Sequence, residues 1–349
     1  MDAFQSGLAQ AALAFWAYLG PQPNSTHQAF GAFATGSLAN MARNYFWFLL
    51  MGAVLYAVFL RKRGAALTPA AVLRYLLPAS VYKTPSVRID LMMVPISWVL
   101  NFLLFAGLAV GSGVAQIWLV QHYGHSPLQV PAGWMAVALQ IAFTLLGTDL
   151  ARFAWHYQGH KVAFFWEFHK GHHSAETLHP VFIRTHPVDM FIRLLYMNMG
   201  GGLLGGGLMY LTGVDASATA AGYLAVIGTV FHFMQQFEHS HVKFSFGKTL
   251  DTIFYPPHFH QIHHSALLAH RDKNFGLTGG LCLWDKLAGT LYIPKADEKI
   301  VYGASMEELG DNNPHRTLWG FLSGPFVAAV RTLGRHAEGP GERPAREVA

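Results

Sequence analysis

The chain has few cysteines and few charged residues. It contains one cysteine, Cys282, among 349 residues, so no disulfide can form within the chain and the fold does not depend on an oxidising compartment. Only 12% of the residues are charged, whereas 52% are hydrophobic, a balance well outside that of soluble globular proteins. The shortage of charge points first to a lipid bilayer.

The sequence also lacks the signals of several other function classes. The net charge is +5, but the lysines and arginines lie at the ends of apolar runs and in the last segment, which suits membrane anchoring better than nucleic-acid binding. The run Gly200-x-Gly202-x-x-Gly205 has the spacing of a dinucleotide fingerprint, yet it lies inside an apolar stretch instead of between a strand and a helix. No H-E-x-x-H zinc-protease motif occurs.

Apolar runs recur along the chain, and a membrane-spanning helix needs about 17 to 25 such residues. The candidate spans are residues 44–60, 91–110 (continuing toward 120), 132–147, 194–211 and 218–233. Residues 8–19 have no basic residue before them and are interpreted as a short interfacial or re-entrant helix instead of a signal peptide. Residues 318–330 are too short to span and contain Pro325, which favours an interfacial helix. We predict an all-α integral membrane protein with about four to five transmembrane or re-entrant helices.

Positive charge is distributed unevenly between the connections. Residues 1–42, 121–131 and 212–217 contain no lysine or arginine, whereas the loop after the first span contains Arg61, Lys62, Arg63, Arg74, Lys83 and Arg88. Because such residues are retained on the cytoplasmic side, this loop is predicted to lie inside, and counting spans from it places every histidine cluster on the same side. Arg43, at the outer end of the first span, is the one charge against this orientation. We expect a bacterial inner-membrane protein whose active site faces the cytoplasm.

These patterns divide the chain into four segments. Residues 1–43 form an N-terminal segment with the interfacial helix, and residues 44–130 hold transmembrane helices and the basic loop. Residues 131–300 contain the clustered histidines and are predicted to form a catalytic domain whose cytoplasmic helical cap carries a histidine-rich di-metal site. Residues 301–349 form a C-terminal amphipathic segment and a tail, rich in Pro, Gly, Glu and Arg, that is predicted to be disordered.

Histidines are concentrated in one region, where fifteen of the twenty lie between residues 156 and 270. Three groups have the spacing of metal ligands, namely His156 with His160 at i and i+4, and two H-x-x-H-H triplets, His169/His172/His173 and His260/His263/His264. On a helix, residues at i, i+3 and i+4 share one face, so each triplet is expected to direct three imidazoles at one point. Imidazole suits iron, zinc, copper and nickel. Eight rings exceed the needs of one ion, so the pattern predicts two metals with positions left open for oxygen.

This pattern resembles the sterol desaturase and fatty acid hydroxylase superfamily of membrane-bound di-iron enzymes. The matching segments, all between about residues 130 and 295, are DLARFAWHYQGHKVAFFWEFHKGHHS at 149–174, FEHS at 237–240, HQIHHS at 260–265, DKNFG at 272–276 and WDKLAGT at 284–290. Segment 149–174 resembles the first two histidine boxes of the superfamily. Segment 237–240 resembles the third box, and segment 260–265 resembles the fourth. The resemblance implies nine metal ligands, which are His156, His160, His169, His172, His173, His239, His260, His263 and His264.

Other residues near the boxes are weaker candidates. His241 and His179 stand where bacterial members of the superfamily usually or often have Asn, and each is interpreted as a further ligand, an outer partner of a ligand, or neither. His232, seven residues before His239, is another candidate ligand, and His186 is expected to orient a ligand. Three carboxylates beside the boxes are candidate partners for the outer nitrogens of ligand imidazoles, with helix capping or loop bracing as the alternative: Asp149, Asp272 and Asp285. No catalytic residue is predicted beyond the metal ligands.

The resemblance also implies a reaction and its co-reactants. Two iron ions with O2 as co-substrate would hydroxylate or desaturate an unactivated C–H bond of a lipid such as a sterol or fatty acyl chain. No flavin, nicotinamide, iron–sulfur or haem site is recognisable, so electrons are expected from an external ferredoxin or cytochrome with its reductase. The alternative is a histidine-rich membrane metal transporter or metal-binding protein. That class places ionisable residues within its spans, whereas these histidines lie mostly beyond the apolar runs.

Overall fold

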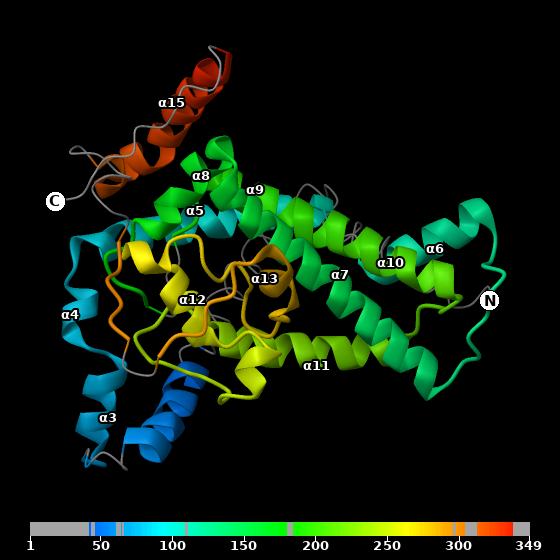
Figure 1. Ribbon diagram of the computed structural model, residues 1–349, viewed down its shortest axis with the longest axis horizontal. Helices are drawn as coiled ribbons and strands as arrows, with labels where there is room; N and C mark the ends of the chain where they lie inside the picture. Colours follow the sequence, from blue (N-terminus) through cyan, green and yellow to red (C-terminus); the bar gives the residue numbers. More distant parts are fainter. Residues whose placement is uncertain are drawn as a thin grey trace, which may run out of the picture.

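The regular elements of the chain are helices (Figure 1). The computed structural model describes residues 42, 46–60, 64, 66–108, 111–179, 184–295, 298–303 and 313–337. Within this part there are no strands beyond two isolated β-bridges, which confirms the predicted all-α class. The segments for which an N-terminal interfacial helix and a disordered tail were predicted lie outside the described residues, as do Arg43, Arg61, Lys62 and Arg63.

An elongated helical limb forms one end of the molecule (Figure 1). Its helices are α6 (Ser112–Tyr123), α7 (Trp134–Lys161), α10 (Gly201–Thr212) and α11 (Ala218–Gln235), and α10 packs against both α6 and α7. Glycines allow this close approach, because a Cβ placed at Gly147 would lie 2.7 Å from the carbonyl oxygen of Gly201, and one at Gly206 would lie 2.5 Å from that of Ser112. The glycines of α10, together with Gly147 of α7, therefore allow close helix packing, as in small-xxx-small motifs.

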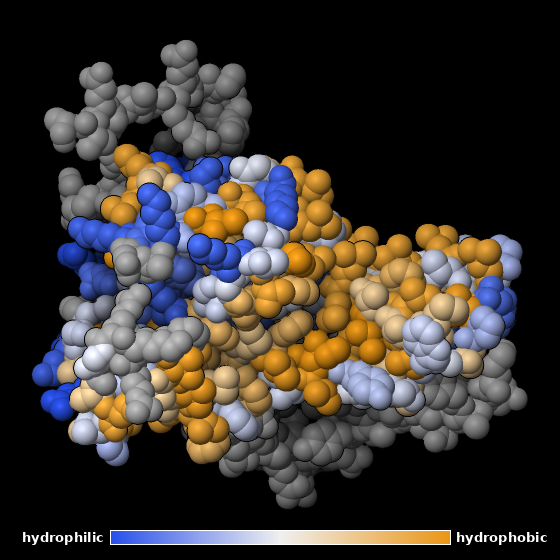
Figure 2. Space-filling view, turned by 60° about the horizontal axis from the view of Figure 1, so that its bottom comes forward, coloured by the Kyte–Doolittle hydropathy of each residue, from blue (hydrophilic) through white to orange (hydrophobic). Residues whose placement is uncertain are grey.

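The surface of the limb is largely apolar, as the right-hand side of Figure 2 shows. Its exposed side chains include Leu203, Leu204, Leu211, Tyr223, Val226 and Val230. Among the described residues, α7 is the one helix both long and apolar enough to cross a membrane. The predicted count of four to five spans is not reached by this criterion, in part because the run 194–211 is divided between the π-helix η3 (Leu195–Gly200) and α10. The apolar surface favours contact with lipid, while span number and orientation stay predictions.

Shorter helices form a cap at the other end of the molecule (Figure 1). They are α3 (Pro69–Leu76), α4 (Ala79–Tyr82), α8 (Ala163–His173), α9 (Pro187–Leu194), η4 (Leu250–Thr252), α12 (Pro257–His263), η5 (Leu268–His270), α13 (Leu283–Ala288) and η6 (Pro314–Arg316). Residues 46–55 are helical and continue into the π-helix η1 (Tyr56–Leu60). This segment packs through Phe48 against Leu76 and Phe237.

Two long helices support the cap from outside. Helix α5 (Pro85–Leu108) contacts α9, and α15 (Leu318–Ala337) contacts α8 and α5. Phe321 of α15 is fully buried, whereas Trp319, Val327 and Val330 are exposed. Helix α15 is thus amphipathic and contains Pro325 within the helix; its interfacial location stays a prediction, as does the division of the chain into four segments.

Candidate metal centre

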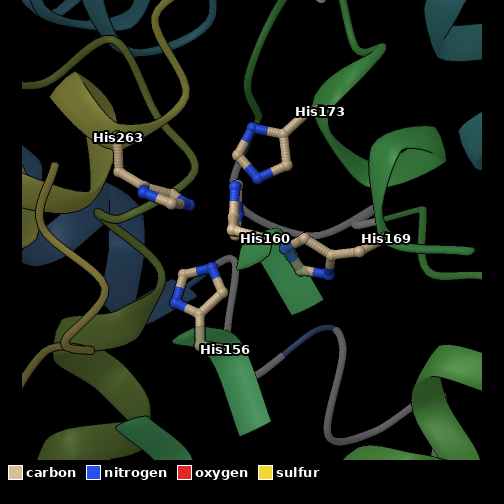
Figure 3. A group of neighbouring side chains, drawn as sticks. All are labelled: His156, His160, His169, His173 and His263. Carbon is tan, nitrogen blue, oxygen red and sulfur yellow. The ribbon is translucent and has the colours of Figure 1, made fainter. Parts of the chain in front are cut away.

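Nine imidazoles from four separate stretches of the chain meet in the cap. The larger group consists of His156, His160, His169, His173 and His263, and the smaller group consists of His172, His239, His260 and His264. Within each group the candidate ligand nitrogens lie within 4.8 Å of one another. Figure 3 shows the five rings of the larger group gathered around one space. The structure therefore brings together all nine histidines that the sequence pattern singled out.

The two H-x-x-H-H triplets are shared between the groups. His169 and His173 belong to the larger group and His172 to the smaller, while His263 belongs to the larger group and its two triplet partners to the smaller. Neighbouring helical residues differ in direction by about 100°, so adjacent imidazoles such as those of His172 and His173 diverge. The expectation that each triplet converges on one point was therefore wrong: each triplet serves both groups.

A sharp bend between two helices aims the first two boxes at the same space. Helix α7 presents His156 and His160 on its last turns, and Val162 then adopts an extended conformation with φ −99° and ψ 114°. The chain turns back into α8, which packs against α7. The rings of His160 and His173 consequently approach to 4.6 Å between centroids.

The inward nitrogens of the larger group are buried without partners. The Nε2 atoms of all five histidines make no hydrogen bond, although each is shielded from solvent. Leaving a buried polar atom unpaired costs free energy, and such exceptions mark sites that a further group completes. A metal ion is the natural acceptor of five converging imidazole lone pairs.

The inward nitrogens of the smaller group crowd together instead. The Nε2 atoms lie 3.0 Å apart between His260 and His264, 3.1 Å between His239 and His264, and 3.2 Å between His172 and His239. Two imidazole nitrogens on one metal ion, each about 2.1 Å from it at roughly a right angle, would be about 3 Å apart. The donor atoms of this group therefore also fit a metal ion.

Hydrogen bonds of the Nδ1 atoms, which are the outer nitrogens, fix the orientation of four of the rings. The Nδ1 atom of His156 donates to the carbonyl of Phe275 at 2.8 Å, that of His263 to Lys273 at 2.9 Å, and that of His172 to Arg184 at 2.9 Å. The fourth, in His169, bonds Asp189 Oδ2 at 2.9 Å. A hydrogen on Nδ1 leaves the lone pair on Nε2, which is the tautomer that a metal ligand requires.

Asp189 is the carboxylate that holds a ligand-candidate imidazole, and sequence reasoning missed it. It is 4% exposed and accepts hydrogen bonds from His169 Nδ1 and, at 3.0 Å, from Trp155 Nε1. Burial opposes its ionisation, but the interaction with His169 holds the pKa of Asp189 below its ordinary value. His186 caps the helix that carries Asp189 by accepting from the Val188 N–H at 3.2 Å. His186 makes no direct bond to a candidate ligand, and its predicted orienting role stays a prediction.

Asp285 shapes the loop whose carbonyls receive two of the rings. Its carboxylate accepts from the backbone N–H groups of Phe275 at 2.8 Å and Gly276 at 2.7 Å, and from Thr290 Oγ1 at 2.6 Å. Asp285 is fully buried, and burial raises its pKa. By fixing this loop, Asp285 sets where the carbonyl of Phe275 meets His156.

The same loop contains two residues with left-handed backbone conformations. Asp272 has φ 57° and Asn274 has φ 59°, a region that side chains other than glycine adopt mainly when local bonds hold them. The Asn274 amide donates to the carbonyl of Tyr292 at 2.8 Å and accepts from its N–H at 2.7 Å. The carbonyl of Lys273 between them is thereby directed at His263.

The three predicted carboxylates brace loops and do not bond imidazoles. Asp149 accepts from the N–H of Leu281 at 2.9 Å and from Trp284 Nε1 at 2.8 Å. Asp272 forms an ion pair with Lys161 at 2.8 Å. Asp285 accepts hydrogen bonds from the backbone N–H groups of Phe275 and Gly276. The bracing alternative therefore describes their geometry.

The additional histidines lie outside both groups. His241 bonds the carbonyl of Tyr75 through Nε2, and His179 Nε2 lies 3.1 Å from Asp90 Oδ2. His232, on α11, likewise joins neither group. Within the described part of the chain, the geometry gives none of the three the place of a tenth ligand.

Burial favours the neutral form of rings in both groups. It lowers the pKa of both His172 and His263 to about 3, so both are unprotonated near neutral pH, as metal binding requires. Cys282 is no competing ligand, because it is buried outside both groups and burial raises the pKa of its thiol to about 12.

Access to the two groups differs. A pocket of about 260 Å³ has His160, His173 and His263 of the larger group in its wall, together with His264. The smaller group borders a space of only about 10 Å³, at His172 and His239. A molecule from outside would therefore meet the larger group first.

Comparisons with known proteins converge on the same region of the chain. Residues 141–290, which include all nine histidines, match the family described as fatty acid hydroxylase. The ornithine lipid hydroxylase OlsE of Rhizobium tropici is 30% identical over 182 residues, which is 52% of this chain and 49% of that protein. The chain thus spans about half the length of the curated relative that it matches. No solved structure matches the chain significantly.

Proposed function

We propose that the chain belongs to the fatty acid hydroxylase and sterol desaturase superfamily and is a membrane-bound, O2-dependent lipid hydroxylase with a di-iron centre. Residues 141–290 match the family described as fatty acid hydroxylase, and a lipid hydroxylase is 30% identical over 182 residues. The observation that carries the proposal is the pair of histidine groups, with five unpartnered buried nitrogens in one and four mutually close nitrogens in the other. A matched family and a relative that are both described as hydroxylases favour hydroxylation over desaturation.

The residues that would hold the two ions follow from the grouping. One iron would bind among the five histidines of the larger group and the other among the four of the smaller group. An all-imidazole donor set also suits zinc or copper, so the assignment to iron rests on the family. When bound, the irons would supply the activation of O2.

The protein's own residues orient the ligands and exclude water. The Nδ1 bonds fix ring orientation, and burial of eight of the nine rings keeps bulk water from the inward nitrogens. In the overall reaction one oxygen atom enters a new C–O bond in place of hydrogen, and the other leaves as water. Two electrons and two protons must be supplied. We propose an external ferredoxin or cytochrome with its reductase as the source of the electrons, and the protons come from solvent.

The proposed location is the inner membrane, with the cap on the cytoplasmic side. Arg74, Lys83 and Arg88 lie on or beside α3, α4 and α5, at the cap end of the molecule (Figure 1). Lysine and arginine near membrane helices favour the cytoplasmic side. The exposed apolar limb would then lie in the bilayer.

Metal and oxygen measurements on the full chain in detergent test this proposal. We expect about two tightly held irons per chain, and O2 consumption with formation of hydroxylated lipid when a reductant and a bacterial lipid extract are added. Replacement of the exposed His122, on α6, by Ala is the matched control and should change neither result. Weakly held, exchangeable zinc without oxygen consumption would favour the metal-transporter alternative.

A further inference from the structure

The pocket that reaches the larger group has a positive charge at its rim that no described residue compensates. Its described lining contains three charged side chains, Lys161, Arg271 and Asp272. Lys161 and Asp272 neutralise each other in an ion pair of 2.8 Å. The exposed side chain of Arg271 forms no hydrogen bond or ion pair with any residue in the described part of the chain. Among the described residues of the rim, the Arg271 guanidinium is therefore the one charged group without a partner.

The pocket becomes less exposed from this rim toward the histidines. Leu268, in the wall near the rim, is 64% exposed, whereas His173 and His263 are 6% and 5% exposed. Other apolar wall residues are Ala163, Trp166, Ala266 and Leu267. A bound molecule would thus contact a cation, an apolar wall and the larger group together.

The size of the pocket limits what part of a lipid can enter. Pockets that enclose a whole small ligand usually measure about 300 to 1,000 Å³, and this one measures about 260 Å³. This volume is slightly below the size that encloses a whole small ligand, so a bound lipid would lie partly within the pocket, near His160 and His173, and extend beyond it.

We propose that Arg271 binds an anionic group of the lipid substrate, so that the carbons close to this group are the ones presented to the larger group. This inference rests on the proposed function and extends it to a substrate class, an acidic or zwitterionic lipid. A carboxylate and a phosphate both match the planar fork of a guanidinium, which can donate two parallel hydrogen bonds to either. Arg271 is thus a specificity-determining residue.

Binding of defined amphiphiles to the full chain in neutral detergent tests the recognition of the anion. The probes are N-dodecanoylglycine, dodecyl phosphate, the methyl ester of N-dodecanoylglycine and the chainless N-acetylglycine, each titrated by calorimetry. We expect at least one long-chain anion to bind about tenfold more tightly than the ester. Whichever of N-dodecanoylglycine and dodecyl phosphate binds more tightly identifies the anionic group as a carboxylate or a phosphate. Binding of N-acetylglycine as tight as that of the long anions would overturn the assignment to a lipid.

Substitutions of Arg271 provide the decisive comparison. Because this side chain is exposed, R271Q should fold normally, and it should abolish the preference for anions over the ester. R271K should restore part of the preference, since lysine keeps the charge but not the fork. Arg331, an exposed arginine on α15 that does not line the pocket, is the matched control, and R331Q should behave as the wild type. A preference that persists in R271Q overturns the inference.

Turnover distinguishes this inference from the proposed function. For an acidic lipid that is hydroxylated, R271Q should raise KM about tenfold and change kcat by less than about twofold, and mass spectrometry should place the new hydroxyl near the anionic group. Equal use of neutral and acidic lipids by both proteins would overturn the inference and leave the hydroxylase function intact. Absence of hydroxylation of every lipid, with the binding preference retained, would overturn the function alone.

Discussion

The two histidine groups are held in place by different means. Three of the five rings in the larger group, those of His156, His169 and His263, have outer nitrogens bonded to protein, and their inward nitrogens have no partner. In the smaller group only His172 has such an outer bond, and the inward nitrogens contact one another. The protein frame orients the larger group in advance, whereas the smaller group depends more on what its rings surround. The open pocket also lies at the larger group, which suggests that the preorganised group faces the substrate.

Removing one ligand from each group should have the largest effect. His263 and His264 are neighbours in sequence but belong to different groups, so the variants H263A and H264A probe the groups separately. We expect each variant to hold about one iron per chain instead of about two, and to lose activity by at least about a hundredfold, because even outer partners of ligands contribute roughly 10- to 100-fold. Iron content measured by mass spectrometry checks this. Retention of both irons by either variant would contradict the division into two groups.

Loosening the frame of the larger group should have the next largest effect. In D189N the amide can no longer accept from both His169 and Trp155, so we expect iron affinity or activity to fall by about 10- to 100-fold. Competition with a coloured chelator should show weaker binding of one iron and an unchanged second iron. D215N is the matched control, since exposed Asp215 bonds Gln116 at 3.1 Å and belongs to neither group. An equal loss of both irons in D189N would show that the groups are not independent.

Acid should destabilise the metal-free protein through both groups, and the effect of one ring over one pH unit should be smaller than the effects of the substitutions above. The pKa of His172 in the smaller group and of His263 in the larger group is about 3, below the ordinary 6.5. Unfolded chains take up protons below about pH 6.5 while the folded rings stay neutral. Stability should therefore fall as the pH decreases from about 6.5 toward 3.

Thermal unfolding of chelator-treated protein at successive pH values measures this dependence. H172Q removes one titrating ring, so the slope should decrease by about 1.4 kcal/mol per pH unit. A larger change from H263Q than from H172Q would sharpen the contrast between the groups. Stability independent of pH over this window would contradict the neutral, buried state of the rings.

The sequence identified the ligand candidates but not their distribution. Histidine spacing singled out eight rings and the family resemblance added His239, and all nine meet in the cap. Spacing along one helix could not show that His172 and His173 face different groups, because that depends on where the rings of α12 and of the turn at His239 lie. Spare histidines such as His241 and His179 look the same in sequence as ligands, and only their contacts with Tyr75 and Asp90 separate them.

The residues that bond or orient the candidate ligand imidazoles were harder to predict than the ligands themselves. Asp189 stands in the first turn of α9, where an acidic residue is common for its interaction with the helix dipole alone. No local signal shows that its carboxylate meets His169, twenty residues away in sequence. Asp285 stood in a recognisable motif, but its action on loop backbone could not be distinguished from a bond to an imidazole.

The sequence by itself determined the helical class, the apolar character of the limb and the chemistry of the donors, because these depend on composition and on periodicity along single segments. The tertiary structure decided which ring joins which group, which carboxylate holds a ring, and that an arginine without a partner among the described residues stands at the entrance to the larger group. Each of these depends on the approach of segments that lie tens of residues apart, and a metal site requires positions set to within fractions of an ångström. Spacing within one segment cannot fix such positions.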